Sequence, residues 1–168
     1  QPAAAGAIDV AELTRMRVAS LSALARERFV RITLHADEHL TFEIDPTGLA
    51  SIVDNLVDNA IRHAEFCGAV EVRLGLHGGA LRLTVLDDGP GIPPAHRERV
   101  FERFHRVPGN GGAGTGLGLS IVKRVADLHR ARVTVGDGLR GRGAGITVEI
   151  PAPGEHPGAD PVPHPVRT

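Results

Sequence analysis

Residues 47–64 constrain the fold more than any other part of the sequence, because their apolar and polar side chains both recur at helical spacing. An apolar stripe is formed by Leu49, Ile52, Val53, Leu56, Val57 and Ala60. A polar set lies at i, i+4, i+7 and i+8, and it consists of Asn55, Asn59, Arg62 and His63. The pattern predicts an amphipathic helix that buries one stripe and gathers four polar groups on another face.

The polar face has two interpretations that this helix alone leaves open. A solvated face would favour Glu, Lys and Gln, since Asn is a poor residue in the middle of a helix. The four groups could simply cap neighbouring loops. Alternatively, the carboxamide oxygens of Asn55 and Asn59 suit a hard cation such as Mg²⁺, and Arg62 adds a cation for phosphate oxygens.

Charge and composition exclude several classes of function. The 168 residues amount to one domain, and 19 Lys and Arg against 20 Asp and Glu leave a net charge of -1. We therefore expect no nucleic-acid partner and no membrane contact by this segment. The single Cys67 cannot form an internal disulfide. No long apolar run and no signal-peptide pattern is present, and any membrane span of a longer protein would lie upstream.

The remaining elements follow from periodicity and turn residues. Residues 8–29 predict one amphipathic helix with Asp9 as its N-cap, and further helices are expected over 94–104 and 117–129. Strands are predicted over 30–34, 40–44, 69–76, 80–86, 131–137 and 145–150, with a hairpin at His77-Gly78-Gly79. The domain boundaries expected are 1–29, 30–151 and a Pro-rich, disordered tail over 152–168.

Two glycine-containing segments suggest a ligand site. In "VLDDGPGIPP" a strand brings Asp87 to a turn at Gly89 and Gly91, where a carboxylate can accept from an exocyclic amine and a flat base can approach. In "GTGLGLS", residues 114–120, a loop runs into a helix whose first N–H groups can receive phosphates. An ordinary turn and a flexible linker are the alternative interpretations.

Two nucleotide motifs are excluded by their context. The GxGxxG match at Gly109, Gly111 and Gly114 follows a predicted helix instead of a strand, and no GxxxxGK[ST] occurs in the chain. A dinucleotide fold and a P-loop NTPase are therefore not supported.

Taken in order, "DNLVDNAIRHA", "DDGPGI", "FERFHR" and "GTGLGLSIVKRV" resemble the four boxes of the ATP-binding domain of sensor histidine kinases, members of the GHKL superfamily. The resemblance spans residues 8–151. It implies an α/β (α+β) two-layer sandwich, a mixed β-sheet with helices packed on one face. It also implies that Mg²⁺ and ATP bind between the helical layer and a flexible lid, and that the chain is the catalytic domain of a protein-histidine kinase.

The resemblance further implies a role for individual residues. Asn59 resembles the family's Mg²⁺-binding residue, and Asn55 resembles the neighbouring residue at the metal or the phosphates. Asp87 resembles the residue that accepts a hydrogen bond from the adenine amino group. Arg62 and Arg106 resemble the phosphate-binding cations, and His63, where the family often has Tyr, would lie against the nucleoside. The other implied nucleotide contacts are Gly89, Gly91, Ile92, Gly114, Thr115, Gly116, Leu117, Gly118 and Leu119. Phe101 and Phe104 resemble the aromatic pair that anchors the lid.

The resemblance also indicates a kinase instead of a hydrolase. The hydrolytic branches carry Glu one turn before the metal-binding Asn, and here that position is Asn55, whose amide cannot take a proton from water. The family's phosphate acceptor is a His on a separate helical hairpin domain, and residues 1–30 contain no His. We therefore expect an isolated catalytic domain whose partners are ATP, that hairpin and, through the full kinase, a response regulator, on the cytoplasmic side of a membrane-bound sensor.

Two alternatives share the same pocket. One is a serine-protein kinase of the anti-sigma-factor type, whose small chains usually lack a "FERF" helix followed by a long glycine lid. The other is a nucleotide-binding module that catalyses no transfer.

Overall fold

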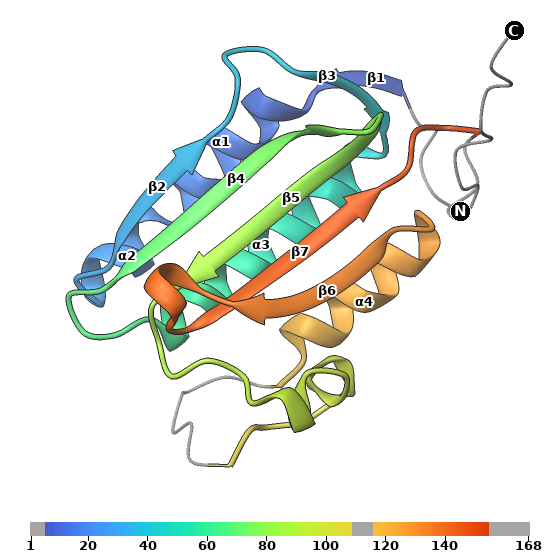
Figure 1. Ribbon diagram of the computed structural model, residues 1–168. Helices are drawn as coiled ribbons and strands as arrows, with labels where there is room; N and C mark the ends of the chain where they lie inside the picture. Colours follow the sequence, from blue (N-terminus) through green and yellow to red (C-terminus); the bar gives the residue numbers. More distant parts are fainter. Residues whose placement is uncertain (1–5, 109–115, 155–168) are drawn as a thin grey trace, which may run out of the picture.

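The computed structural model describes residues 6–108 and 116–154, which form a five-stranded sheet with helices on one face (Figure 1). The strand order is β2-β4-β5-β7-β6. These strands are β2 (Arg31–His35), β4 (Ala69–His77), β5 (Ala80–Asp87), β7 (Ala144–Ile150) and β6 (Arg132–Asp137). β2 and β4 pair in parallel and the other neighbours are antiparallel. The predicted two-layer arrangement with a mixed sheet is confirmed.

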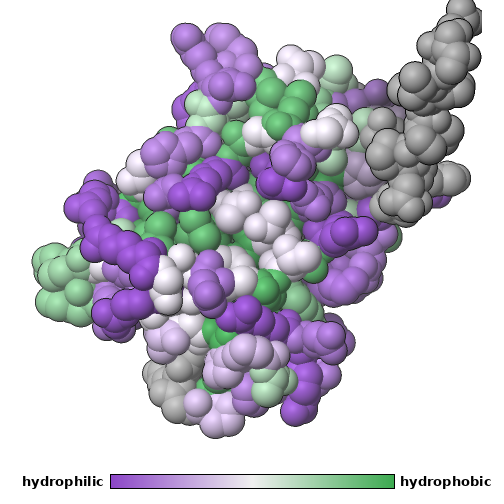
Figure 2. All heavy atoms as spheres, in the orientation of Figure 1, coloured by the Kyte–Doolittle hydropathy of each residue, from purple (hydrophilic) through white to green (hydrophobic). Residues whose placement is uncertain are grey.

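The two faces of the sheet differ as the period of a strand requires. Along β5, Leu81, Leu83 and Val85 are buried against the helices, and the alternate residues Arg82 and Thr84 lie on the other face. Figure 2 views that other face, over which hydrophilic side chains are spread. Helices therefore cover only one side, and that side holds the core.

Helix α3 (Pro46–His63) lies across the covered face, with α1 (Val10–Ser20) and α4 (Gly118–Leu128) packed beside it (Figure 1). Its N-cap is Asp45, whose carboxylate accepts from the N–H groups of Thr47 at 3.2 Å and Gly48 at 3.0 Å. The whole predicted stripe is buried: Leu49, Ile52, Val53, Leu56, Val57 and Ala60. That burial fixes the rotation of α3 and hence the direction of its polar face.

The single helix predicted over residues 8–29 is wrong. Residues 6–9 form strand β1 (Gly6–Asp9), which pairs antiparallel with β3 (Thr41–Ile44), and α1 ends before a second helix, α2 (Ser22–Glu27). The break follows from Ser20, whose hydroxyl donates to the Arg17 carbonyl at 2.6 Å, while the Leu21 N–H bonds to Val18 at 3.1 Å. Asp9 is the N-cap of α1, as predicted.

The helix predicted over residues 94–104 is also wrong. Two short 3₁₀ turns stand there, η1 (Pro94–His96) and η2 (Arg99–Phe101). The N–H of Arg97 bonds to Pro94 and that of Glu102 to Arg99, each three residues back, and the backbone of Glu102 is extended. A third turn, η3 (Leu139–Gly141), joins β6 to β7 and was not predicted.

The outer parts of the chain add two observations. Within residues 6–108 and 116–154, no helix combines the length and the apolar character that crossing a membrane requires. The predicted tail over 152–168 lies outside the described residues from residue 155 onward.

The core position of α3 can be tested with a matched pair of substitutions. Leu56 is 1% exposed and Leu128, at the end of α4, is 69% exposed. We expect Leu56→Ala to lower the free energy of unfolding by about 2–5 kcal/mol, because it leaves a cavity, and Leu128→Ala to change it by less than about 0.5 kcal/mol. Urea denaturation measures both. Similar losses in the two variants would contradict the placement of the stripe.

Candidate functional site

A cavity of ≈ 610 Å³ lies where the C-terminal half of α3 faces the turn after β5 and the beginning of α4. It gathers most of the residues that the sequence singled out: Asn55, Asn59, Arg62, His63, Asp87, Gly91, Ile92, Arg106, Gly116, Leu117, Gly118 and Leu119. Gly89 does not line this cavity. Gly114 and Thr115 lie outside the described residues. The cavity therefore joins segments that are distant along the chain.

The asparagines of α3 form one wall. The side-chain nitrogen of Asn55 donates to the Ser51 carbonyl at 2.8 Å, so that its oxygen is left to face the cavity. A Cβ placed on Gly118 would lie 3.4 Å from this oxygen, which puts Asn55 directly against the beginning of α4. Asn59 lines the same wall one helical turn further on.

Asp87 closes the cavity at the end of β5. Its carboxylate is 4% exposed, and Oδ1 accepts from the N–H groups of Gly89 at 2.9 Å and Ala144 at 3.1 Å. Burial raises the pKa of Asp87 to about 6, although these two donors act in the opposite direction. The carboxylate thus keeps lone pairs for a further donor although Asp87 is buried.

Close backbone contacts explain two glycines beside Asp87. A Cβ on Gly89 would lie 2.0 Å from the His63 carbonyl oxygen, and one on Gly143 would lie 2.1 Å from the Asp87 carbonyl oxygen. Gly89 therefore packs the turn against the end of α3 and does not itself line the cavity. Gly143, which the sequence analysis did not single out, has φ +72 and lets β7 begin beside Asp87.

The charged end of α3 holds a partner that sequence reasoning missed. Asp58 lines the cavity and accepts from Arg62 twice, at 2.8 Å and 3.1 Å, which raises the pKa of the Arg62 guanidinium. The i,i+4 spacing of the two residues could have signalled this pair. Burial, and then the positive charge of Arg28, lower the pKa of His63, so this ring is neutral at pH 7.

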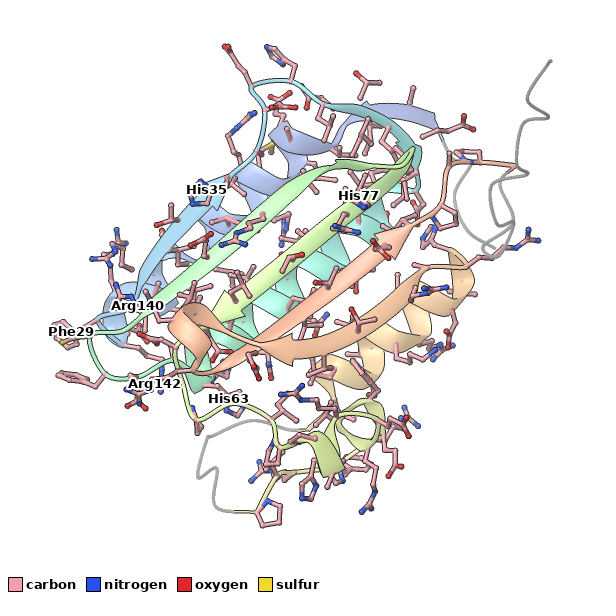
Figure 3. The ribbon with its side chains drawn as sticks, in the orientation of Figure 1. Phe29, His35, His63, His77, Arg140 and Arg142 are labelled. Carbon is pink, nitrogen blue, oxygen red and sulfur yellow. The ribbon has the colours of Figure 1, made fainter. Side chains whose placement is uncertain are left out.

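Arg28 also caps the C-terminal end of α3. Its guanidinium donates to the carbonyls of Ile61 at 3.2 Å and Arg62 at 2.9 Å, two groups that the end of an α-helix leaves without helical partners. Figure 3 shows His63 at this end of α3, close to the turn that follows β5.

The beginning of α4 supplies the opposite wall. Leu117, Gly118 and Leu119 line the cavity, and the cap residue Leu117 makes no side-chain cap hydrogen bond, so the positive end of the α4 dipole lies at this wall. Gly116 has φ +70, and a Cβ there would lie 3.0 Å from the Cα of Phe104. Arg106 lines the cavity on this side.

The aromatic residues of "FERFHR" do not line the cavity. Phe104 is 69% exposed and takes φ +61, and its N–H bonds to the Gly116 carbonyl at 3.1 Å. Apolar lining on this side comes instead from residues that the sequence analysis did not single out, above all Val100 and Val107 with Ile121 of α4. Ordinary apolar residues within a longer pattern carry no local signal of such a role.

The two ends of the cavity suit different groups of one ligand. The Asp87 end offers a buried acceptor among apolar residues, and the end between α3 and α4 offers amide oxygens, cations and helix N–H groups. In the part of the chain that the structure describes, no set of three or more His, Cys, Asp or Glu side chains could hold a metal ion. A metal at this site would therefore rely on amide oxygens and on oxygens of the ligand.

Residues 44–154 match the model of the family described as histidine kinase-, DNA gyrase B- and HSP90-like ATPases. The chain belongs to this family. The swarming motility regulation sensor protein RssA of Serratia marcescens is 38% identical over 76% of this chain and 27% of its own length. The sensor protein kinase PmrB of Pseudomonas aeruginosa is 34% identical over 86% of this chain and 30% of its own length. The chain thus spans less than a third of these curated relatives.

Solved structures agree with the family. The mycobacterial sensor histidine kinase MprB superimposes with a TM-score of 0.73 at 31% identity, over 88% of this chain and 97% of that one. Full-length ShkA in complex with AMPPNP gives a TM-score of 0.77 at 31% identity, over 88% of this chain and 31% of that one. The predictions of a GHKL fold and of the ATP-binding catalytic domain of a histidine kinase are confirmed.

The raised pKa of Asp87 predicts a specific pH dependence of stability. Because its folded-state pKa of about 6 exceeds 3.8, the stabilisation is full below pH 3.8 and is lost as the pH rises through 6. Relative to Asp87→Asn, we expect the parent's free energy of unfolding to fall by about 1–3 kcal/mol between pH 4 and pH 7. Urea denaturation at several pH values tests this, with the exposed Asp37→Asn as control. A constant difference between the Asp87 variant and the parent would contradict it.

Proposed function

We propose that this domain binds Mg²⁺ and ATP in the cavity and transfers the γ-phosphate to a His on a separate helical hairpin domain. The observation that carries the proposal is the pairing, within one cavity, of a buried acceptor at Asp87 with amide oxygens and helix N–H groups at the other end. An adenine nucleotide has an amino donor at one end and phosphates at the other. The two ends of the cavity match those two ends of the ligand.

Asp87 recognises the base. The exocyclic amine of adenine donates to the carboxylate, whose position is fixed by the N–H groups of Gly89 and Ala144. Gly91 leaves room for the flat ring, and Ile92 and the neutral His63 line the space around it. The notable requirement is that Asp87 be ionised, which its pKa of about 6 allows at pH 7.

The donor set of α3 fits Mg²⁺. Asn55 has its amide nitrogen committed to Ser51, so its oxygen is the group available in the cavity, and Asn59 presents a carboxamide one turn away. When bound, Mg²⁺ supplies charge neutralisation for the phosphate oxygens. Asn59 would be the principal ligand and Asn55 its neighbour at the metal or the phosphates.

The phosphates meet the N-terminal end of α4 and two cations. Gly116, Leu117 and Gly118 line the cavity, so the N–H groups at the beginning of α4 can donate to phosphate oxygens there. Leu119 adds apolar cover. Arg106 contributes a cation from the segment that follows η2. Arg62 contributes one from α3, held in place by its double hydrogen bond to Asp58.

Transfer to a protein acceptor is favoured over hydrolysis. Asn55 stands where a water-activating carboxylate would be required, and its amide cannot accept a proton. Asp58 also lines the cavity, but both of its oxygens accept hydrogen bonds from Arg62. Phosphoryl transfer itself asks the protein chiefly for positioning and charge neutralisation, which these residues supply.

The setting in a longer protein is part of the proposal. Sensor kinases such as PmrB and RssA, of which this chain covers less than a third, support a His-bearing hairpin and a response regulator as partners. We place the domain on the cytoplasmic side of a membrane-bound sensor. The boundaries at residues 29 and 151 remain part of the same proposal, although Val10 and Ala11 of α1 are buried in the core that α3 shares.

A transfer assay tests the proposal. With labelled ATP, we expect the domain to phosphorylate a histidine-bearing hairpin domain supplied in trans and to give an acid-labile product. Without the hairpin, we expect the chain neither to become labelled nor to hydrolyse ATP rapidly. Asn59→Ala should abolish transfer through loss of Mg²⁺, and Thr47→Ala, in the exposed first turn of the same helix, should leave it unchanged. In Asn55→Glu we expect faster hydrolysis, because a carboxylate at this position can accept a proton from the attacking water.

The rival functions would give different products. Label on a Ser of an antagonist protein would indicate a serine kinase, and nucleotide binding without transfer to any hairpin would indicate a non-catalytic module.

A binding experiment isolates the base end. We expect Asp87→Asn to weaken ADP binding by about ten- to a hundredfold, since a charge-assisted hydrogen bond is worth about 1.5–3 kcal/mol. The affinity ratio of parent to variant should shrink as the pH falls below about 6, where Asp87 becomes protonated. Calorimetric titration at pH 5 and pH 8 measures both ratios, and titration of the phosphates cancels between the two proteins. Equal affinities at pH 8 would remove Asp87 from the adenine site.

A further inference from the structure

Two histidine rings meet at the edge of the cavity. His96 belongs to η1, and His105 follows η2 and lines the cavity. Nδ1 of His96 lies 3.3 Å from Nε2 of His105, the ring centroids are 5.5 Å apart and the rings are inclined by 36°. Both rings are half-buried, and neither has a role in the nucleotide site proposed above.

The distance between these two nitrogens suits a shared metal ion. As a hydrogen bond this contact lies at the long end, since bonds from nitrogen usually span about 2.7–3.2 Å. Two imidazole nitrogens bound to a tetrahedral zinc ion, each at about 2.0–2.1 Å, lie about 3.3–3.4 Å apart. A right-angled, square-planar arrangement would bring them to about 2.8–3.0 Å. The observed spacing therefore fits tetrahedral coordination.

Each of the two histidines lies in a segment with contacts of its own. Next to His96, Arg97 donates to the Ile92 carbonyl at 2.9 Å and to Asp137 of β6 at 2.7 Å, which ties η1 to the sheet and balances the Arg97 charge. The N–H of His105 bonds to the Glu102 carbonyl at 3.3 Å. The two imidazoles thus lie in contact with each other before any metal ion is added.

We propose that His96 and His105 bind a divalent transition-metal ion of the zinc class, with water in the remaining positions. Without metal, one ring donates a hydrogen bond to the other. To bind the metal, the donor ring carries its proton on its other nitrogen, so that both facing nitrogens have a lone pair. Each ring then turns by about 35°, so that its lone pair points at the metal ion instead of at the other nitrogen. Because no third ligand joins the pair among the described residues, the site is weaker than a structural zinc site. The proposal does not depend on nucleotide binding.

Zinc titration by calorimetry, without nucleotide, tests the site. All proteins carry Cys67→Ser, because the exposed thiol of Cys67 is itself a zinc ligand. We expect one Zn²⁺ per chain in the parent and an affinity about tenfold or more lower in both His96→Gln and His105→Gln. The control is His77→Gln, since this exposed residue lies at the far end of β4 (Figure 3) and should leave the affinity unchanged.

A second measurement separates coordination from a general effect on folding. Co²⁺ should give the visible absorption of a tetrahedral complex with the parent and the His77 variant, and lose it with either variant of the pair. Zn²⁺ should raise the melting temperature of the parent but not that of His96→Gln or His105→Gln. Equal Zn²⁺ affinity in all four proteins, or loss of binding in His77→Gln alone, would overturn the proposal and leave the pair as a hydrogen bond only.

Discussion

The burial of Asp87 is the constraint on which the rest of the site depends. A carboxylate that is 4% exposed at the end of a core strand is tolerable only because the N–H groups of Gly89 and Ala144 donate to it. These two donors come from the turn after β5 and from the first residue of β7. The carboxylate therefore fixes both segments, and the contacts at Gly89 and Gly143 leave no space for a side chain between them and their neighbours. One buried polar group thus sets the position of the base end relative to the sheet.

The apolar stripe of α3 sets the position of the other end. Since Leu49, Ile52 and Leu56 must face the sheet, the helix has one permitted rotation, and the asparagines are directed along its side toward α4. The Asn55 side chain uses its nitrogen on its own helix, and its oxygen lies beside Gly118 at the beginning of α4. This division explains why Asn can occur mid-helix: a carboxamide can satisfy a local carbonyl and still present an oxygen to the cavity.

Periodicity and turn chemistry were enough to predict the central sheet strands, α3 and the two-layer arrangement, because these elements are long and bury whole faces. The failures are local and physical. Ser20 interrupts a helix that its apolar pattern would continue, and two 3₁₀ turns stand where a helix was expected over 94–104. Strand β1 is defined by a partner more than thirty residues away. Within the site, Gly143 was missed because its role arises from a contact with the Asp87 carbonyl that a motif does not encode, whereas the i,i+4 spacing of Asp58 and Arg62 did offer a signal.

The two ends of the cavity also differ in how they are attached to the core, and this difference matters for a phosphotransferase. The base end is built from β5, β7 and α3, whose hydrogen bonds belong to the sheet or to a long helix. The phosphate end on the α4 side follows two 3₁₀ turns, where the backbone hydrogen bonds of the described residues join positions close in sequence, such as His96 to Pro93 and Glu102 to Arg99. In the proposed function, binding energy gained at the base end holds the nucleotide while the surroundings of its phosphates admit a protein acceptor. A hydrolase needs only water at that position, whereas a kinase must leave room there for the side chain of a second domain.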